Sequence, residues 1–130
     1  MRFLGIDYGS RRVGVAVSDE EGRIAFPDCV FDNGVSLVED IASLCSERNV
    51  KKIVVGESLD LSGKPNAIMS DIEKFAHALG ARTGLPVFFE PEFFTSVQAR
   101  KASGEHVVDA SAAAIILQSF LDAENEKSAA

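Results

Sequence analysis

Acidic side chains stand at the ends of several apolar stretches of this 130-residue chain. Asp7 ends the first stretch, Glu57 and Glu92 follow two later ones, and Asp109 opens the last. Ligands of an open α/β sheet collect at the carboxyl ends of its strands, so these four carboxylates are expected to converge there. Hard divalent cations bind carboxylate oxygens together with waters and substrate phosphates. The pattern predicts a metal site able to cleave phosphodiester bonds by activating water and stabilising the leaving oxygen.

Each acid also has a simpler interpretation. Asp7 can cap a turn through its own backbone. Glu57 and Glu92 can be solvated loop residues, and Asp109 can be a helix N-cap. The prediction of a site therefore depends on the joint placement of the four residues.

A glycine-rich turn follows the first acid, within the segment Gly-Ile-Asp-Tyr-Gly-Ser-Arg-Arg-Val-Gly at residues 5–14. Such a turn can expose backbone N–H groups and a hydroxyl beside an acid, which suits a phosphate. Arg11 and Arg12 would supply positive charge, unless they form only a solvated hairpin tip. Lys64, Arg100 and Lys101 are further candidates for phosphate contacts, with ordinary surface charge as the alternative.

Apolar periodicity predicts the elements that position these residues. Strands are expected at 3–6, 13–17, 24–30, 51–56 and 87–89; helices are expected at 36–48, around 68–79, from Thr95 and from about Asp109. Ser36 and Thr95 each begin a sequence of capping-box form. A meander followed by alternating helices and strands predicts an α/β fold, with a mixed five-stranded sheet covered by helices on both faces. One domain is expected over 1–123, with a frayed tail at 124–130.

Composition restricts the kinds of binding and the cellular location expected for the chain. Thirteen basic and 20 acidic residues give a net charge of −7, which argues against binding nucleic acid or membranes through bulk charge. Cys29 and Cys45 lie among apolar residues and indicate neither a zinc cluster nor a disulfide framework. We expect no signal peptide, no membrane span and a cytoplasmic location.

Four segments together resemble the YqgF/RuvX family, which is associated with pre-16S rRNA nuclease and Holliday junction resolvase-like activity. The segments are residues 5–19, 53–56 with Gly63 beyond them, 92–96 with Ala99, and 108–113 leading into 115–118. The resemblance covers nearly the whole chain. It implies a ribonuclease H-like fold with the sheet order 3-2-1-4-5 and a metal-dependent nuclease site.

Carried over by position, the resemblance assigns Asp7, Glu92 and Asp109 as catalytic acids that hold Mg²⁺ or Mn²⁺. Arg12 matches the basic residue of the first turn, and Thr95 and Ser96 match two hydroxyl positions. The implied reaction is endonucleolytic cleavage of structured nucleic acid, most consistent with processing of the 5′ end of pre-16S rRNA, by a monomer or a homodimer.

The sequence departs from the family pattern around two of the acids. Pro91 stands where the family usually has Asp, and Phe93 stands where it usually has Arg. Glu57 stands where Leu is common, and we expect it to join or substitute in the site. Glu90 offers partial compensation for the acid missing at 91. His106 is a candidate proton donor, with an inert loop histidine as the alternative.

Three other functions remain open from the sequence. The first is resolution of branched DNA by a dimer with the same metal chemistry. The second is a non-catalytic nucleic-acid or ribosome-associated module, which Pro91 and Phe93 suggest. The third is a sugar-kinase or actin-like phosphate binder, although 130 residues leave no second half to close over a nucleotide.

Overall fold

The computed structural model describes residues 1–59, 62–93 and 110–129. The predicted helix at Thr95 and the residues around it lie outside this part of the chain. No helix within it is long and apolar enough to cross a membrane. In chain order the elements are β1 (Arg2–Tyr8), β2 (Arg12–Ser18), β3 (Ala25–Asp32), α1 (Leu37–Glu47), β4 (Val50–Leu59), α2 (Met69–Thr83), β5 (Val87–Phe93) and α4 (Ala110–Ala129).

The five strands form one mixed sheet in the order β3-β2-β1-β4-β5, as predicted. The first three strands pair antiparallel, whereas β1, β4 and β5 run parallel. Strands β4 and β5 extend several residues beyond the predicted ends, and they stay paired from Ile53 with Val87 to Leu59 with Phe93. Pro91 is tolerated within this ladder because β5 is an edge strand of the described sheet.

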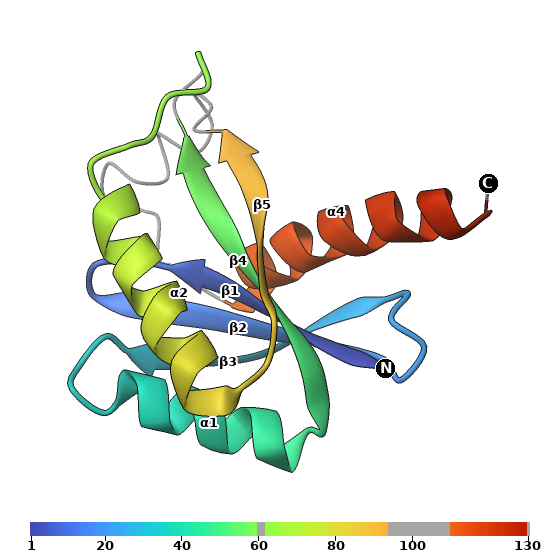
Figure 1. Ribbon diagram of the computed structural model, residues 1–130, viewed down its shortest axis with the longest axis horizontal. Helices are drawn as coiled ribbons and strands as arrows, with labels where there is room; N and C mark the ends of the chain where they lie inside the picture. The colour runs from blue at the N-terminus through green and yellow to red at the C-terminus, as the bar shows by residue number, and fades with distance from the viewer. Residues whose placement is uncertain (60–61, 94–109, 130) are drawn as a thin grey trace.

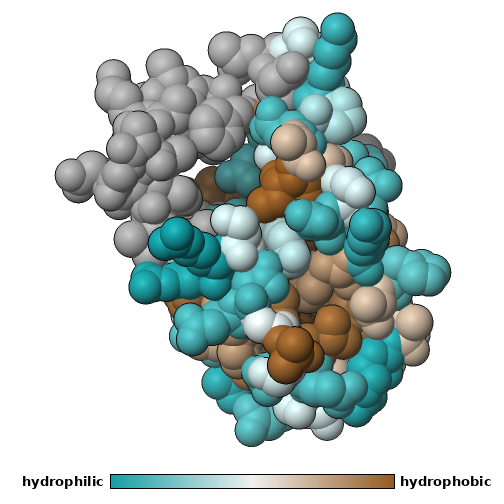
Figure 2. All heavy atoms as spheres, turned by 90° about the vertical axis from the view of Figure 1, so that its left-hand side faces the viewer, coloured by the Kyte–Doolittle hydropathy of each residue, from teal (hydrophilic) through white to brown (hydrophobic). Residues whose placement is uncertain are grey.

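Helices cover both faces of the sheet (Figure 1). The apolar sides of α1 and α2 pack with Leu4, Ile6 and Ile53 in the larger core. The opposite face carries a smaller core in which Val54 meets Ile116 and Leu117 of α4. On the side of the molecule seen in Figure 2, hydrophobic residues lie as separate spots among hydrophilic ones. The predicted two-sided covering of the sheet is confirmed.

The helix ends agree with the sequence in part. Helix α2 stops where Gly84 adopts a φ of 72°, a left-handed conformation that favours glycine. The capping box predicted at Ser36 is wrong, because this residue has φ −92° and ψ 0° and makes no side-chain cap. Its hydroxyl instead donates to Asp40 Oδ2 at 2.9 Å.

The last helix runs through the segment where the sequence predicts a frayed tail. Helix α4 continues to Ala129, and its C-terminal part extends away from the sheet (Figure 1). The Asn125 side chain donates to the Gly22 carbonyl at 3.2 Å, and Gln118 bridges Ala25 and Arg23. These bonds to the β2–β3 turn are tertiary contacts, which composition alone does not reveal.

Helix α4 approaches the sheet closely at Gly5. A Cβ atom at this position would lie 2.6 Å from Leu117 Cβ and 3.0 Å from the Ala113 carbonyl oxygen. Both neighbours belong to the helix backbone or lie next to it, so neither can move aside easily. The absence of a side chain at Gly5 therefore sets the distance between α4 and the sheet.

Replacing Gly5 by alanine is expected to lower the free energy of unfolding by about 1–3 kcal/mol, because overpacking displaces α4. Urea unfolding measures the change. Gly34→Ala is the matched control, since a Cβ there meets nothing within 4 Å, and it is expected to change stability by less than about 0.5 kcal/mol. Equal effects of the two substitutions would contradict the close approach.

Candidate active site

Asp7 lies near the carboxyl end of β1, where the strand turns into β2. The turn is closed by a hydrogen bond from Gly9 N to the Arg12 carbonyl at 2.9 Å, and Asp7 pairs with Gly14 across the strands. Side chains alternate along a strand, so Asp7 shares the α4 face with Gly5, two residues earlier. Only 9% of its surface is exposed. The sheet thus holds a carboxylate in a largely buried position beside α4.

Glu92 reaches the same face from β5. Phe88 and Glu90, four and two residues earlier, contact Phe120 and Ser119 of α4. Alternation therefore turns Glu92 toward the α4 side as well. Strand β4 lies between β1 and β5, and its Gly56 pairs with Glu90, two residues before Glu92. A Cβ at Gly56 would lie 3.2 Å from Glu92 Oε2, so the missing side chain gives the carboxylate its space.

The two carboxylates affect each other electrostatically. Burial raises the pKa of Glu92 to about 7, and the nearby Asp7 carboxylate contributes to the same rise. Both causes disfavour a second negative charge in a poorly solvated place. A divalent cation would reverse this effect, because it is attracted to both carboxylates.

Glu57 is not brought to this pair. It follows Gly56 in a regular part of β4 and pairs with Pro91, so alternation places it on the face that carries α1 and α2. The sequence suggested a shared site because Glu57 follows an apolar run, but the strand continues past it to Leu59. Its proposed part in metal binding stays a prediction that the geometry does not favour.

The basic residues of the first turn lie close to Asp7 along the chain. Arg12 begins β2 two residues before Gly14, the partner of Asp7, and alternation puts both on the α4 face. Arg11 and Arg12 are exposed. Asn33 supports the turn by donating from its side chain to the Gly9 carbonyl at 2.8 Å and from its backbone to the Arg11 carbonyl. Sequence analysis missed Asn33, and an isolated asparagine gives no signal of this role.

The other predicted residues are more remote or are not described. Lys64 is exposed in the connection between β4 and α2, beyond the carboxyl end of β4. The remaining candidates lie outside the described residues: Thr95, Ser96, Arg100, Lys101, His106 and Asp109. Within residues 1–59, 62–93 and 110–129, no group of three His, Cys, Asp or Glu side chains is arranged around a metal position. Two carboxylates are still a suitable donor set, since Mg²⁺ commonly binds one or two of them and completes its shell with water and phosphate.

The mixed sheet in the order β3-β2-β1-β4-β5, covered by helices on both faces, is a ribonuclease H-like fold, and solved structures agree. The chain is similar to Thermus thermophilus RuvC, with a TM-score of 0.59 and 16% identity over 97% of both chains. A structure of T. thermophilus RuvC in complex with Holliday junction substrate gives a TM-score of 0.56, with 15% identity over 95% of both. These similarities show the fold alone.

Sequence comparison identifies the family. The family model described as "RuvX: Holliday junction resolvase" matches residues 1–123, so the chain belongs to the RuvX family. A Chloroflexus aggregans protein named "Putative pre-16S rRNA nuclease" is 38% identical, over 93% of each chain. A Syntrophus aciditrophicus protein of the same name is also 38% identical, over 98% of this chain and 92% of its own length.

Glu92→Gln is expected to change the pH dependence of stability. Between the ordinary pKa of 4.5 and the folded value of about 7, the unfolded chain releases the Glu92 proton while the folded chain keeps it. The folded state therefore loses up to about 3 kcal/mol of relative stability as pH rises through this window. Glu92→Gln lacks this titration, so its stability should fall less between pH 5 and pH 8.

Urea unfolding with EDTA present, at pH 5 and at pH 8, measures this difference. Asp7→Asn removes the neighbouring charge and should give an intermediate result, because burial is the larger cause of the raised pKa. Identical pH dependence in wild type and Glu92→Gln would show that the ionised Glu92 carboxylate is not destabilised in the folded protein.

Proposed function

We propose that this chain is a metal-dependent endonuclease of structured nucleic acid, processing the 5′ end of pre-16S rRNA. The observation that carries the proposal is the placement of Asp7 and Glu92 on one face of the sheet, separated by Gly56. Membership of the RuvX family supports a nuclease, and the names of the relatives support a ribosomal RNA substrate. The nuclease domain comprises residues 1–123, and its location is the cytoplasm.

Asp7 and Glu92, together with Asp109, would hold Mg²⁺ or Mn²⁺. A divalent cation supplies Lewis-acid chemistry, which favours attack of water on phosphorus and stabilises charge on the leaving oxygen. The protein contributes fixed oxygen ligands, because Asp7 and Glu92 project from paired strands rather than from loops. Partial exclusion of water around them strengthens their interaction with a cation.

Basic side chains near the turn would position the substrate. Arg11 and Arg12 contact phosphates in this proposal, with Lys64, Arg100 and Lys101 extending the contact. Phosphate contacts of this kind fix orientation without reading bases. Cations bound at the acidic site also reduce the −7 charge that otherwise repels a polyanion.

A DNA junction is the second candidate substrate, supported by the printed description of the family. The metal chemistry would be the same, and a homodimer would present two sites where a monomer presents one. A catalytically inactive member that only binds nucleic acid is a third outcome, because Pro91 and Phe93 replace charged residues of the family pattern.

Purified protein is expected to cleave an rRNA precursor with Mg²⁺ or Mn²⁺, and to cleave a four-way DNA junction less. Asp7→Asn and Glu92→Gln should each lower the rate at least about 100-fold, more than the loss of a supporting residue in a metal site. Glu57→Gln is the matched control on the opposite face of β4 and should keep its activity. Gel analysis of end-labelled substrates reports the products. Equal cleavage by wild type and Asp7→Asn would refute the mechanism, and preferred cleavage of the junction would favour the DNA alternative.

Mn²⁺ is expected to raise the melting temperature of the wild type by several degrees at pH 8, since a ligand that binds only the folded state stabilises it. Asp7→Asn should abolish most of this rise. Gly56→Ala should weaken it, because the new methyl group would lie 2.8 Å from Ile116 Cδ1 and 3.2 Å from Glu92 Oε2. Scanning fluorimetry without nucleic acid makes the measurement independent of cleavage. A rise that is the same in wild type and Asp7→Asn would show that the ion binds elsewhere.

A further inference from the structure

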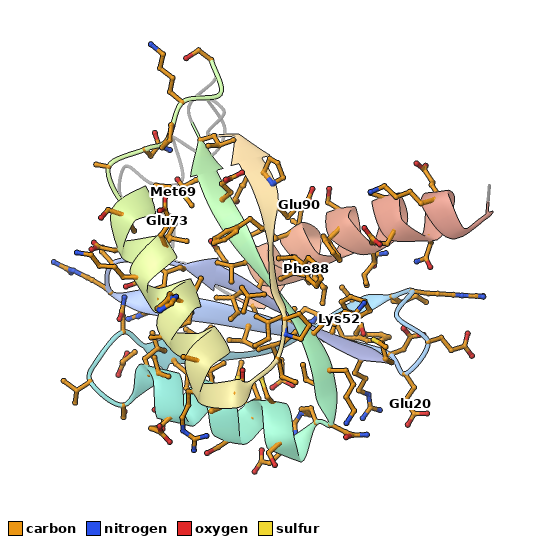
Figure 3. All side chains as sticks on the ribbon, in the orientation of Figure 1. Glu20, Lys52, Met69, Glu73, Phe88 and Glu90 are labelled. Atoms are coloured by element: carbon orange, nitrogen blue, oxygen red, sulfur yellow. The ribbon has the colours of Figure 1, made fainter. Side chains whose placement is uncertain are left out.

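A cluster of aromatic side chains and one lysine lies on the same face of the sheet as the carboxylate pair. Lys52 of β4 holds its ammonium 5.8 Å from the centre of the Phe3 ring and 5.7 Å from that of Phe88. Phe120 of α4 completes the cluster, with ring centres 6.0 Å from Phe3 and 5.5 Å from Phe88. Figure 3 shows Lys52 and Phe88 along the neighbouring strands β4 and β5.

Part of this cluster is open to solvent. Helix α4 packs mainly on β1, β2 and β3, and it covers β4 and β5 less. Phe88, the second residue of the edge strand β5, keeps 36% of its surface exposed. This part of the surface therefore combines an exposed apolar ring with the positive charge of a neighbouring lysine.

No carboxylate of the described residues forms an ion pair with Lys52, although acidic residues outnumber basic ones. The aromatic rings stabilise the ammonium by cation–π interaction and keep it above Phe88. A ligand with a flat ring and a negative group would satisfy both Phe88 and Lys52.

The cluster lies on the same face of β5 as Glu92 of the proposed cleavage site. Phe88 and Glu92 lie four residues apart on one face of β5, which is about 13 Å. This distance is about the length of four stacked nucleotides in one strand. Glu90 lies between them, and its carboxylate accepts a hydrogen bond from Ser119 at 2.9 Å, which ties it to α4 (Figure 3).

We propose that Phe88 and Lys52 form a subsite for single-stranded nucleic acid, in which a base stacks on Phe88 and Lys52 contacts a phosphate a few nucleotides from the cut. This inference rests on the proposed nuclease function and adds a binding position to it. Stacking on aromatic rings tolerates any base, so the subsite selects unpaired strand rather than sequence. Substrates with a single-stranded flank next to the cleaved bond are therefore preferred.

The chain provides matched controls for this subsite on the opposite face of the same strands. Lys51 precedes Lys52, and Phe89 follows Phe88 with a similar exposure of 39%. Alternation points Phe89 to the side of α1 and α2. Lys51 lies at a register shift of β4 and lines a pocket on that same side with Ala42 of α1 and Arg82 of α2. Phe88→Ala and Lys52→Gln can thus be compared with Phe89→Ala and Lys51→Gln, which make the same chemical change one residue away.

Binding of fluorescently labelled single-stranded RNA, followed by anisotropy in the Asp7→Asn background with Mg²⁺, tests the proposal without cleavage. Phe88→Ala should weaken binding at least about fivefold, and Phe88→Tyr should restore it because the ring is kept. Lys52→Gln should lower the slope of log K against log salt by about 0.7. Phe89→Ala and Lys51→Gln should change neither quantity appreciably, and thermal melting of each variant checks that it is folded.

Equal effects of the two matched pairs, or no binding of single-stranded RNA, would overturn the subsite. Failure of Phe88→Tyr to restore binding in a folded protein would also overturn the subsite, since the surface would then serve another kind of partner. Cleavage is measured separately, in chains that keep Asp7. If the chain cleaves RNA but Phe88→Ala changes neither binding nor cleavage, the subsite alone is refuted. If Phe88→Ala weakens binding and Phe89→Ala does not, but the wild type does not cleave, the nuclease function alone is refuted.

Discussion

The parallel pairing of β1, β4 and β5 around Gly56 is the constraint on which the candidate site depends. It brings Asp7 and Glu92, 85 positions apart in the chain, to the two sides of one residue that has no side chain. A larger residue at this point would meet both Glu92 and Ile116 of α4. The same close packing lets α4 lie on the sheet and keeps the carboxylates poorly solvated, which raises the pKa of Glu92.

Placing Asp7 and Glu92 close together lowers the stability of the folded state, and a bound cation would remove this destabilisation. Two carboxylates in a largely buried place repel each other, and the fold raises the pKa of one of them, Glu92, to about 7. A site that is unfavourable for its own charges without a ligand is well prepared for a divalent cation. The net charge of −7 therefore argues against binding of nucleic acid through bulk charge, but it does not exclude binding through local contacts. In the proposed function, binding depends on cations and on local contacts such as those of Arg12 and Lys52.

The α4 face of the sheet combines the features that the proposals use. Asp7, Glu92 and Arg12 lie near its carboxyl-end edge, and the ring cluster with Lys52 lies farther back along β4 and β5. The opposite face serves the core formed with α1 and α2, and Tyr8 packs there with ring centres 5.0 Å from Phe75. The alternation of side chains lets one sheet support a core on one face and the proposed substrate surface on the other.

The sequence alone determined the element order, the mixed sheet and Asp7 and Glu92 as candidate acids, because apolar periodicity and local turn residues encode these features. The family resemblance added the strand order. Sequence could not place Glu57, since an error of a few residues in the end of β4 decides between a loop acid and a side chain on the opposite face. It also gave no sign of the space at Gly56, of the α4 tail bound by Asn125, or of the pairing of Lys52 with Phe88. Only the tertiary structure decided these points, because each arises from atoms that meet across strands and helices far apart in the chain.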